Sequence, residues 1–540
     1  MQENICEQRS SLGQKIDFLI GQKVFPVILF CCGAALRLKH YFENRSLWLD
    51  EAYLSIDIAN TSLFGLASFQ TILPGQPRQP VGFLIISKIF TLIFGICEYS
   101  LRLFPLLSSL LALYILYLLT KKVLGRNAAL LALAIFTFAE PLVYYAAEVK
   151  PYSCDVLISL ILFFSSINFL TGDISVKKIR DFCLLGIVSM WFSTSSLLVL
   201  PAIGFLILCR IFKEKKLELF ISFASTCVFF ITNFLIIYVK SLSKMLANSS
   251  IMSTSIPVFM PRPIWSLSSL HWLLEKSTGI FEHSLGMGMG FGYLALTLLL
   301  VGCYDLFKKN RMMGALFLLP LMTFLAANFL HKYPFHYRML LFLTPCIVIF
   351  ISQGFFAVIK MLPCGCLSSR ILIIAMLIFP SARMSLNSFV KPHRYSNTRP
   401  VIKYLSEHYQ KGDSLIYNNS AQYLYGFYHG LFRMGSDTEL IVKIENWEDD
   451  EPKTKIERKY QYLVFNEKGY LRGTYKDPYV DAHLYKDIRH YENNPRTWLF
   501  LSQLSFAQKK MTVEFFMRNG RKLLELNEDG ASLYMFDMSR

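Results

Sequence analysis

The stretch Arg45-Ser-Leu-Trp-Leu-Asp50-Glu51-Ala-Tyr53-Leu-Ser-Ile-Asp57 comes directly after the first of twelve long apolar stretches in the chain. A helix that crosses a membrane needs about 20 mostly apolar residues. Of the 540 residues, 54% are hydrophobic and 17% are charged, whereas soluble domains carry about 25% charged residues. The composition therefore predicts a polytopic α-helical membrane protein with a soluble appendage. The apolar stretches lie near residues 17–38, 81–97, 102–120, 128–147, 155–171, 182–195, 196–210, 217–239, 290–307, 313–330, 337–359 and 370–387.

The net charge of +17 is concentrated in the apolar part of the chain. Residues 1–390 contain 32 Lys and Arg against 18 Asp and Glu, and the remaining residues contain 23 against 20. Basic residues near membrane helices report the orientation of those helices. The positive charge therefore gives no support to a nucleic-acid-binding protein, and we expect no nucleic-acid partner.

Five short basic loops indicate which stretches cross the membrane. Suppose that 81–97 lies at the outer interface, and that 182–195 and 196–210 form a hairpin turning at Ser193–Ser196. All five loops then fall on the side of the N-terminus, which the positive-inside rule makes the cytoplasm. Lys88 in the middle of 81–97 favours this arrangement. The sequence thus predicts about 11 transmembrane helices, with the N-terminus inside and the C-terminus outside. The loops contain Lys121, Lys122 and Arg126; Lys177, Lys178 and Arg180; Arg210, Lys213, Lys215 and Lys216; Lys308, Lys309 and Arg311; and Lys360 and Arg370.

We expect three parts in the chain. Residues 1–16 form a cytoplasmic N-terminus, 17–387 form the transmembrane domain with a long first outer loop at 39–101, and 388–540 form an extracytoplasmic α/β domain. This last part, the tail, has no glycine-rich phosphate loop and no metal-ligand cluster, so we expect it to pack or to handle an acceptor. Its expected helices are Val401–Gln410, Ala421–His429 and Val513–Asn519, and its expected strands are Ser414–Tyr417, Glu439–Ile444, Tyr460–Phe465, Thr497–Ser502, Lys522–Leu526 and Ala531–Asp537.

The acidic pair Asp50-Glu51 is the sharpest candidate for chemistry. It lies just outside the first crossing in a predicted amphipathic helix, and the spacing of Asp50, Tyr53 and Asp57 places them on one face. Trp48 is an aromatic residue suited to anchor this helix at the interface. The alternative is an interfacial helix whose carboxylates merely face water.

Two further polar groups lie on the same predicted side of the membrane. The second outer loop carries Glu148, Lys150, Tyr152 and Asp155, which could bind a substrate or simply solvate the mouth of two helices. A later turn carries cations that suit a lipid phosphate, since Arg binds phosphate bidentately; alternatively, these side chains form a snorkelling belt. The later turn contributes His331, Lys332, His336, Tyr337 and Arg338, and Arg78 and Arg102 flank the interfacial segment and could join the anion site.

Several blocks together resemble one family of membrane enzymes. Ser46-Leu-Trp-Leu-Asp-Glu-Ala-Tyr53 resembles the first-loop motif of the GT-C superfamily of integral-membrane glycosyltransferases, in the branch similar to protein mannosyltransferases and aminoarabinose transferases. Gln79-Pro80-Val-Gly-Phe, Glu148-Val-Lys-Pro-Tyr152 and Tyr333-Pro-Phe-His-Tyr-Arg338 resemble later blocks of that family. The resemblance covers about residues 20–385. It departs from the family's pattern at Lys150, where the family usually has Arg.

The resemblance implies an inverting glycosyltransferase of the bacterial inner membrane. Such an enzyme moves a sugar from a polyprenyl-phosphate-linked donor to an acceptor on the outer face, the acceptor being a glycolipid, lipid A, a polysaccharide or a protein hydroxyl. Asp50 would be the general base, and Glu51 would orient the acceptor or tune Asp50. The donor phosphate would contact Lys150, Arg338, Arg78 and His336, and the substrate would also contact Tyr53, Glu148, Tyr152 and Asp155.

Three alternatives concern the cofactor and the class of protein. A divalent metal could help the phosphate leave, as in the oligosaccharyltransferase branch, but the supply of Lys and Arg makes it dispensable, so we expect no metal and no cofactor. A translocator of lipid-linked sugars would bind the same ligands without chemistry. The third alternative is that the protein is a non-catalytic membrane scaffold. The absence of an internal repeat speaks against a translocator, and the presence of Asp50 and Glu51 speaks against a scaffold.

Overall fold

The computed structural model describes residues 24–70, 79–243, 258–288, 290–361, 367–391, 393–432, 464–465 and 495–539. The chain divides into two compact units. The first, the membrane unit, comprises Met1–Glu43, Pro77–Ser87 and Arg102–Pro392. The second comprises Asn44–Gln76, Lys88–Leu101 and His393–Arg540, and we call it the outer unit because the sequence predicts that it lies outside the membrane. The first-loop motif therefore belongs to the same unit as the tail.

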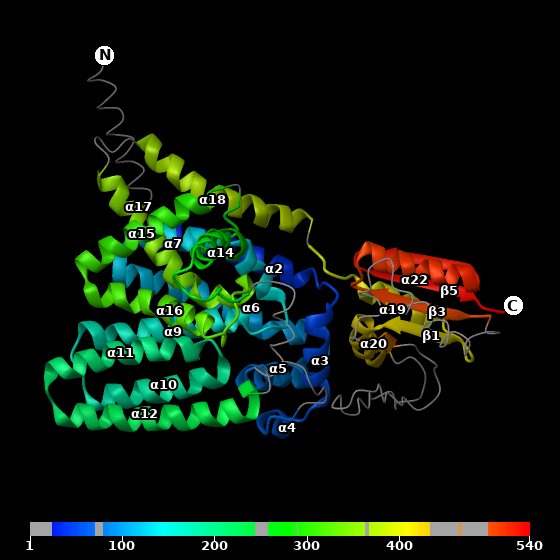
Figure 1. Cartoon of the computed structure of the whole chain (residues 1–540), viewed down its shortest axis with the longest axis horizontal. Helices are drawn as coiled ribbons and strands as arrows, with labels where there is room; N and C mark the ends of the chain where they lie inside the picture. The colour runs from blue at the N-terminus through cyan, green and yellow to red at the C-terminus, as the bar shows by residue number, and fades with distance from the viewer. Residues whose placement is uncertain are drawn as a thin grey trace, which may run out of the picture. The chain divides into compact units, whose positions relative to one another are not determined.

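Each of the eleven stretches predicted to cross the membrane contains a helix or a helix pair in the structure (Figure 1). Eight described helices are long and apolar enough to cross, or nine if one bent pair counts as a single span. The helices are α2 (Val24–Phe42), α6 (Glu98–Leu124), the pair α7 (Arg126–Phe138) and α8 (Glu140–Tyr144), α9 (Tyr152–Thr171), α10 (Val176–Phe192), α11 (Ser196–Glu214), α12 (Leu217–Ile237), α15 (Gly292–Lys309), α16 (Arg311–Phe329), α17 (Thr344–Met361) with the preceding 3-10 helix η3 (Tyr337–Leu343), and α18 (Leu367–Val390).

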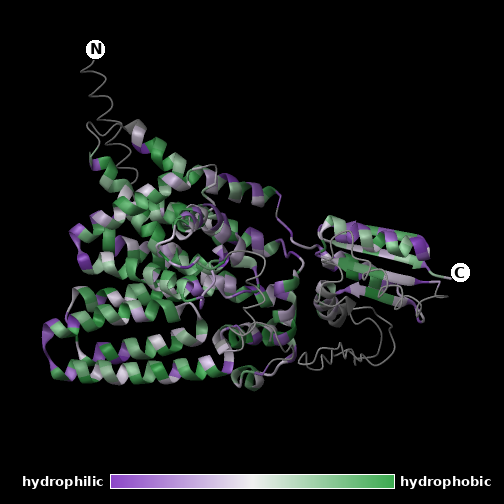
Figure 2. Ribbon diagram, viewed as in Figure 1, coloured by the Kyte–Doolittle hydropathy of each residue, from purple (hydrophilic) through white to green (hydrophobic). Residues whose placement is uncertain are grey.

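Two helices of this set are not counted among the eight, because one is short and the other carries several charged residues. Helix α10 has only 17 residues, and α15 has 18 residues that include Asp305, Lys308 and Lys309. Figure 2 shows that hydrophobic residues cover most of the length of α10, α11 and α12, with hydrophilic residues gathered toward the helix ends. The fold is that of a polytopic membrane protein.

The predicted interfacial segment is the helix α5 (Val81–Phe94). Its 14 residues rise about 21 Å, which is less than the hydrocarbon core of about 30 Å. Lys88 is buried, and its Nζ donates a hydrogen bond to the carbonyl oxygen of Ala59 at 2.7 Å. This short helix is therefore tied to the segment that follows the first-loop motif.

Buried polar and small residues fix the packing of the membrane unit. Arg37 on α2 is fully buried, and its guanidinium donates to Ser109 Oγ at 2.7 Å and to the carbonyl oxygens of Phe136 and Thr137. These carbonyls lie at the end of α7, which is bent by 64° from the segment Glu140–Ala147. A cation thus satisfies carbonyl groups that the helix end leaves without partners.

Helices α15 and α17 approach each other so closely that a side chain would not fit between them. A Cβ atom at Gly302 would collide with the carbonyl oxygen of Phe350, and one at Gly354 would collide with that of Leu298. Small residues that allow such contact are common between helices in membranes.

The tail forms a five-stranded mixed sheet of order β2-β1-β3-β5-β4. Strand β1 pairs in parallel with β2 and β3, and β5 pairs antiparallel with β3 and β4. The predicted α/β domain is confirmed. Its elements are α19 (Thr398–His408), β1 (Ser414–Asn418), α20 (Asn419–Phe432), β2 (Val464–Phe465), β3 (Thr497–Ser502), α22 (Phe506–Asn519), β4 (Arg521–Glu528) and β5 (Ala531–Asp537).

Some sequence predictions differ from the structure or lie outside the described residues. The strand Glu439–Ile444, most of Tyr460–Phe465 and the N-terminus 1–16 lie outside the described residues. Between the apolar stretches 217–239 and 290–307, where the sequence reading predicted no helix or strand, the structure contains the helix α14 (Leu267–Leu285). Its Ser266 N-cap accepts a hydrogen bond from the backbone N–H of Ser269, so this serine starts a helix rather than marking a loop.

Candidate functional site

The acidic pair lies in the first turn of α3 (Leu49–Asn60), where the helix dipole favours negative side chains. The Tyr53 hydroxyl donates a hydrogen bond to Asp50 Oδ1 at 2.9 Å, as their shared helix face predicts. Asp50 is half-buried, whereas Glu51 is only 2% exposed and Asp57 7%. Seven of the twelve residues of α3 are buried. The helix is therefore part of the packed outer unit rather than a helix bathed in water.

The tail holds the residues that lead into α3. The Tyr428 hydroxyl accepts a hydrogen bond from the Leu47 N–H at 2.8 Å and donates one to Glu98 Oε1 at 2.8 Å. Ser46 Oγ accepts a hydrogen bond from the Arg399 N–H at 3.1 Å. These contacts come from parts of the sequence more than 300 residues apart, and they fix the backbone just before Asp50.

Glu98, which accepts the hydrogen bond from Tyr428, also forms an ion pair with Arg399. Arg399 donates to Glu98 Oε1 from Nε at 2.8 Å and from Nη2 at 2.5 Å, and Nη2 also donates to the Asn44 carbonyl at 2.7 Å. The Glu98 side chain is 6% exposed. Burial raises the pKa of the Tyr428 hydroxyl, and the charge of Glu98 raises it further, so Tyr428 stays protonated as a donor. We call Glu98, Arg399 and Tyr428 the clasp.

Aromatic contacts extend the clasp along the same segment. The ring of Trp48 stacks on Tyr395 with centroids 4.7 Å apart, and Tyr53 meets Tyr423 edge to face at 5.9 Å. Trp48 was predicted to anchor the helix at the membrane interface, whereas the structure packs it against an aromatic residue of the tail. The sequence reading did not identify Glu98, Arg399 or Tyr428, because each is distant in sequence from the acidic pair.

The second outer loop places its polar residues inside the membrane unit. Glu148 and Lys150 are buried, with exposed fractions of 0% and 4%, which does not fit side chains that merely solvate a helix mouth. Tyr152 begins α9, and its ring meets Tyr145 edge to face at 5.0 Å. Asp155 accepts a hydrogen bond from Ser193 Oγ at 2.5 Å.

The turn Ser193–Ser196 links the second outer loop to the later one. Ser195 Oγ lies 3.2 Å from the Tyr333 hydroxyl, which donates to the Met339 carbonyl at 3.0 Å. Burial raises the pKa of the Tyr333 hydroxyl, so this group acts as a donor. The hairpin turn therefore bridges Asp155 on one side and the segment that carries Arg338 on the other.

The later cationic group divides into two parts. His331 and Lys332 are exposed, and His331 stacks on Phe259 at 4.8 Å. His336, Tyr337 and Arg338 are half-buried at the start of η3. Of the flanking arginines, Arg102 is 1% exposed, and Arg78 lies outside the described residues.

No group of three or more His, Cys, Asp or Glu side chains that could hold a metal ion occurs among the described residues. The expectation that the chain needs no cofactor stays a prediction.

Comparison with known proteins gives one family and one fold. Residues 77–238 match the model of the family dolichyl-phosphate-mannose-protein mannosyltransferase. No curated protein matches the sequence. Among solved structures, the chain is similar to ArnT from Cupriavidus metallidurans in the apo state and bound to undecaprenyl phosphate. Each match has 11% identity, covers 94% of this chain and 97% of ArnT, and has a TM-score of 0.52.

A second enzyme shares the fold. The Archaeoglobus fulgidus oligosaccharyltransferase in complex with Zn and sulfate is 10% identical, with 95% of this chain and 73% of that chain covered and a TM-score of 0.53. The family match and the shared fold confirm the resemblance to GT-C glycosyltransferases that the sequence motifs indicate. The GT-C type of fold with a small C-terminal α/β domain is likewise confirmed.

Proposed function

We propose that this protein transfers a sugar from a polyprenyl-phosphate-linked donor to a hydroxyl-bearing acceptor on the outer face of a bacterial inner membrane. The observation that carries the proposal is Asp50, a half-buried carboxylate at the start of α3 that accepts a hydrogen bond from Tyr53. The match to ArnT bound to undecaprenyl phosphate supports a lipid-phosphate donor. The acceptor is a glycolipid, lipid A, a polysaccharide or a protein hydroxyl.

In the proposed reaction, Asp50 removes the proton from the acceptor hydroxyl. The acceptor oxygen then bonds to the anomeric carbon of the sugar from the face opposite the phosphate, and the bond between that carbon and the phosphate oxygen breaks. The configuration at the carbon is therefore inverted. The polyprenyl phosphate leaves with the electron pair, and Asp50 holds the proton.

The neighbouring acid and the first-loop tyrosine support this step. Glu51 is buried beside Asp50, where its charge tunes the base or its carboxylate orients the acceptor. Tyr53 fixes the rotamer of Asp50 through its hydrogen bond. In this proposal, the substrate also contacts Tyr152, Glu148 and Asp155 of the membrane unit.

Cations of the membrane unit neutralise the departing phosphate in this proposal. Lys150 is buried, and Arg338 and His336 are half-buried; Arg78 completes the proposed set. Fixed cations stabilise charge that develops in the transition state, and they do so most effectively where water is excluded. We therefore propose a reaction that needs no metal or other cofactor.

The donor-phosphate role makes a prediction about Arg338. Replacing Arg338 with Lys should lower kcat/KM for the donor about tenfold. The lysine ammonium is a point charge, whereas the planar guanidinium of arginine can bind phosphate through two parallel hydrogen bonds. One hydrogen bond to a charged group is worth about 1.5–3 kcal/mol. Replacing Lys150 with Arg should preserve activity, because it introduces the residue usual in the family. Transfer measured on the purified variants tests both. Equal activity of Arg338→Lys and the wild type would favour a snorkelling belt instead.

The proposed orientation predicts the labelling of single cysteines by a reagent that cannot cross the membrane. Cysteines introduced at the exposed positions Asn60, His331 and His408 should react in intact cells. Cysteines introduced at the equally exposed Lys122, Lys177, Lys213 and Lys309 should react only after the cells are opened. Labelling of Lys122→Cys and Lys177→Cys in intact cells would show that α5 crosses, and would contradict an outer active site.

A further inference from the structure

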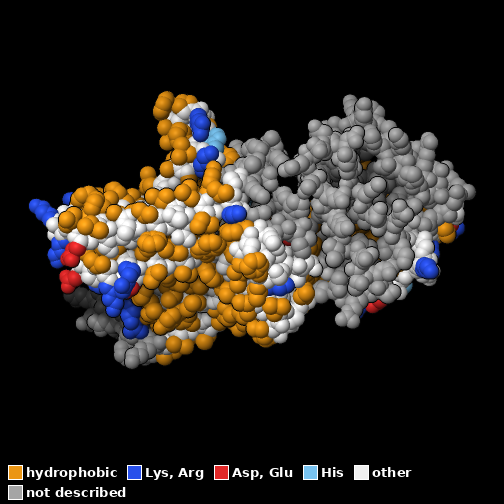
Figure 3. Space-filling model, turned by 90° about the horizontal axis from the view of Figure 1, so that it is seen from below, with side chains coloured by type: hydrophobic (Ala, Val, Ile, Leu, Met, Phe, Trp, Pro, Cys, Tyr) orange, Lys and Arg blue, Asp and Glu red, His pale blue; other side chains and the backbone are white. Residues whose placement is uncertain are grey.

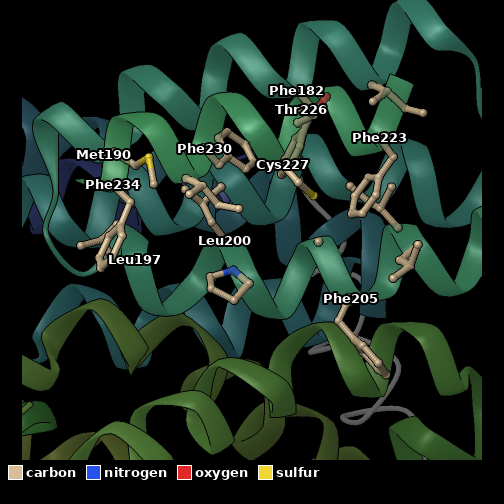
Figure 4. Close-up of a pocket in the computed structure, with 16 residues that line it drawn as sticks. Phe182, Met190, Leu197, Leu200, Phe205, Phe223, Thr226, Cys227, Phe230 and Phe234 are labelled. Carbon is tan, nitrogen blue, oxygen red and sulfur yellow. The ribbon is translucent and has the colours of Figure 1, made fainter. Parts of the chain in front are cut away.

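A cavity of about 600 Å³ lies between α10, α11 and α12 (Figure 4). Its wall is made by apolar side chains such as Phe182, Leu197 and Phe230, and Gly204 leaves room in the middle of α11. Thr226 is the hydroxyl-bearing residue of the wall, and its Oγ1 already donates to the Ser222 carbonyl at 3.0 Å. The wall is thus almost entirely apolar, with Thr226 and Cys227 as its residues that carry a hydroxyl or a thiol.

Such a cavity requires an apolar occupant. An empty space deprives its lining of dispersion contacts, and 600 Å³ is about four times the volume of a ~150 Å³ apolar cavity that binds benzene. Ordered water is a poor occupant, because each buried water needs about 2–4 polar partners. The walls belong to helices of the membrane unit, and α12 exposes Val228 and Phe229 on its outer face. The hydrocarbon of the bilayer therefore has access to this region.

The shape of the cavity fits one chain of one leaflet. Along α11, the lining runs from Leu197 to Leu208, and these eleven steps correspond to about 16 Å of helix. Half of a hydrocarbon core of about 30 Å has nearly the same length.

Basic residues gather at one end of this three-helix group. Lys177 lies in the first turn of α10, Lys213 lies in the last turn of α11, and Lys215 and Lys216 connect α11 to α12. All four are exposed, and none of them forms an ion pair with a described residue. Figure 3 shows Lys and Arg side chains, with a few Asp and Glu among them, at the left end of a broad hydrophobic face. This end offers positive charge to a lipid headgroup, and the cavity reaches toward it through Ile179 and Leu208.

We propose that the cavity holds an acyl chain of an anionic glycerophospholipid whose headgroup contacts the basic residues Lys213, Lys215 and Lys216. This lipid is a fixed part of the membrane unit, separate from the donor, and the proposal does not depend on the reaction assigned above. The apolar wall selects a hydrocarbon chain, and the lysines select a negative headgroup.

The test measures the lipid that remains bound after purification. The full-length protein is reconstituted into nanodiscs of equal phosphatidylglycerol and phosphatidylcholine, extracted into detergent, and analysed by native mass spectrometry. Wild-type protein should retain one phosphatidylglycerol. Gly204→Leu should reduce this retention about tenfold or more, because a Cβ at this position has no atom closer than 3.9 Å and the larger side chain would obstruct the middle of the cavity.

Two controls separate loss of the site from loss of the fold. Gly204→Ala removes the same glycine but leaves most of the volume, so it should retain the lipid. Gly204→Leu should unfold at the same temperature as the wild type or higher, since leucine favours a helix more than glycine does. Retention of phosphatidylglycerol by a folded Gly204→Leu variant would overturn the proposal.

Charge variants test the headgroup. Replacing Lys213, Lys215 and Lys216 with Gln should keep a bound lipid but abolish the preference for phosphatidylglycerol. The matched control replaces Lys308 and Arg311, exposed basic residues at the junction of α15 and α16, and it should keep the preference. An unchanged preference in the Lys213, Lys215 and Lys216 variant would overturn the headgroup assignment, as would retention of phosphatidylcholine by the wild type.

Discussion

Replacing Asp50 with Asn should lower kcat by about 10²–10⁴, the usual contribution of a general base. Asn keeps the shape of the side chain, and its oxygen can still accept the hydrogen bond that Tyr53 donates at 2.9 Å. The amount of folded protein should stay close to that of the wild type, because Asp50 is only half-buried. Single-turnover transfer from a polyprenyl-phosphate sugar tests this result.

The matched control for Asp50 is Tyr53→Phe. This variant removes the hydrogen bond but keeps the carboxylate, so we expect a loss of about tenfold or less, in keeping with one hydrogen bond. Asp50→Asn should therefore lose far more activity than Tyr53→Phe. Near-normal turnover of Asp50→Asn, or an equal loss in both variants, would contradict the assignment of Asp50 as the base.

Replacing Arg399 with Leu should produce the second large effect, although this residue does not take part in the reaction. The change removes both hydrogen bonds to the buried Glu98 and the bond to the Asn44 carbonyl. We expect a loss of about 2–3 kcal/mol of stability. Because a displacement of about 1 Å can cost about 10²-fold in rate, kcat should fall by about that factor with little change in the KM for the donor.

Arg496→Leu is a matched control within the same unit. Arg496 pairs with Asp413 at 2.8 Å, with side chains that are 29% and 3% exposed, and the Arg399–Glu98 pair has 30% and 6%. Both variants should lose similar stability. Only Arg399→Leu should speed hydrogen exchange at the Leu47 amide, which bonds to Tyr428. An equal fall of kcat in both variants would show that the clasp stabilises the tail without positioning Asp50.

The helices of the membrane unit could be predicted because their signal is local. The length and hydrophobicity of each apolar stretch are enough to indicate a membrane helix. In the tail, the strand Ala531–Asp537 has the same bounds in the sequence reading and the structure. The helix carrying Asp50, Tyr53 and Asp57 was also predictable from their spacing. The helix α14 was missed because serine and proline near its start suggest a loop, although Ser266 serves as its N-cap.

The partners of the candidate site could not be predicted, because they depend on contacts across long sequence separations. Glu98 and Arg399 meet across 301 residues, and Ser195 and Tyr333 across 138. Neither residue of the first pair has a neighbouring sequence pattern that indicates the other. Burial also had to come from the structure, since Lys150 and Lys332 are both lysines in predicted outer loops, yet only Lys150 is buried.

The membership of the first loop in the outer unit imposes an order of events during synthesis. Glu98 leaves the ribosome early, and Arg399 follows 301 residues later. At about 5–20 residues per second this delay is roughly 15–60 s. Throughout that interval the helix carrying Asp50 lacks the clasp, while most membrane helices are being inserted. The geometry around the acidic pair is therefore completed only when the tail has folded, so a chain terminated before Arg399 would insert into the membrane but lack a finished site.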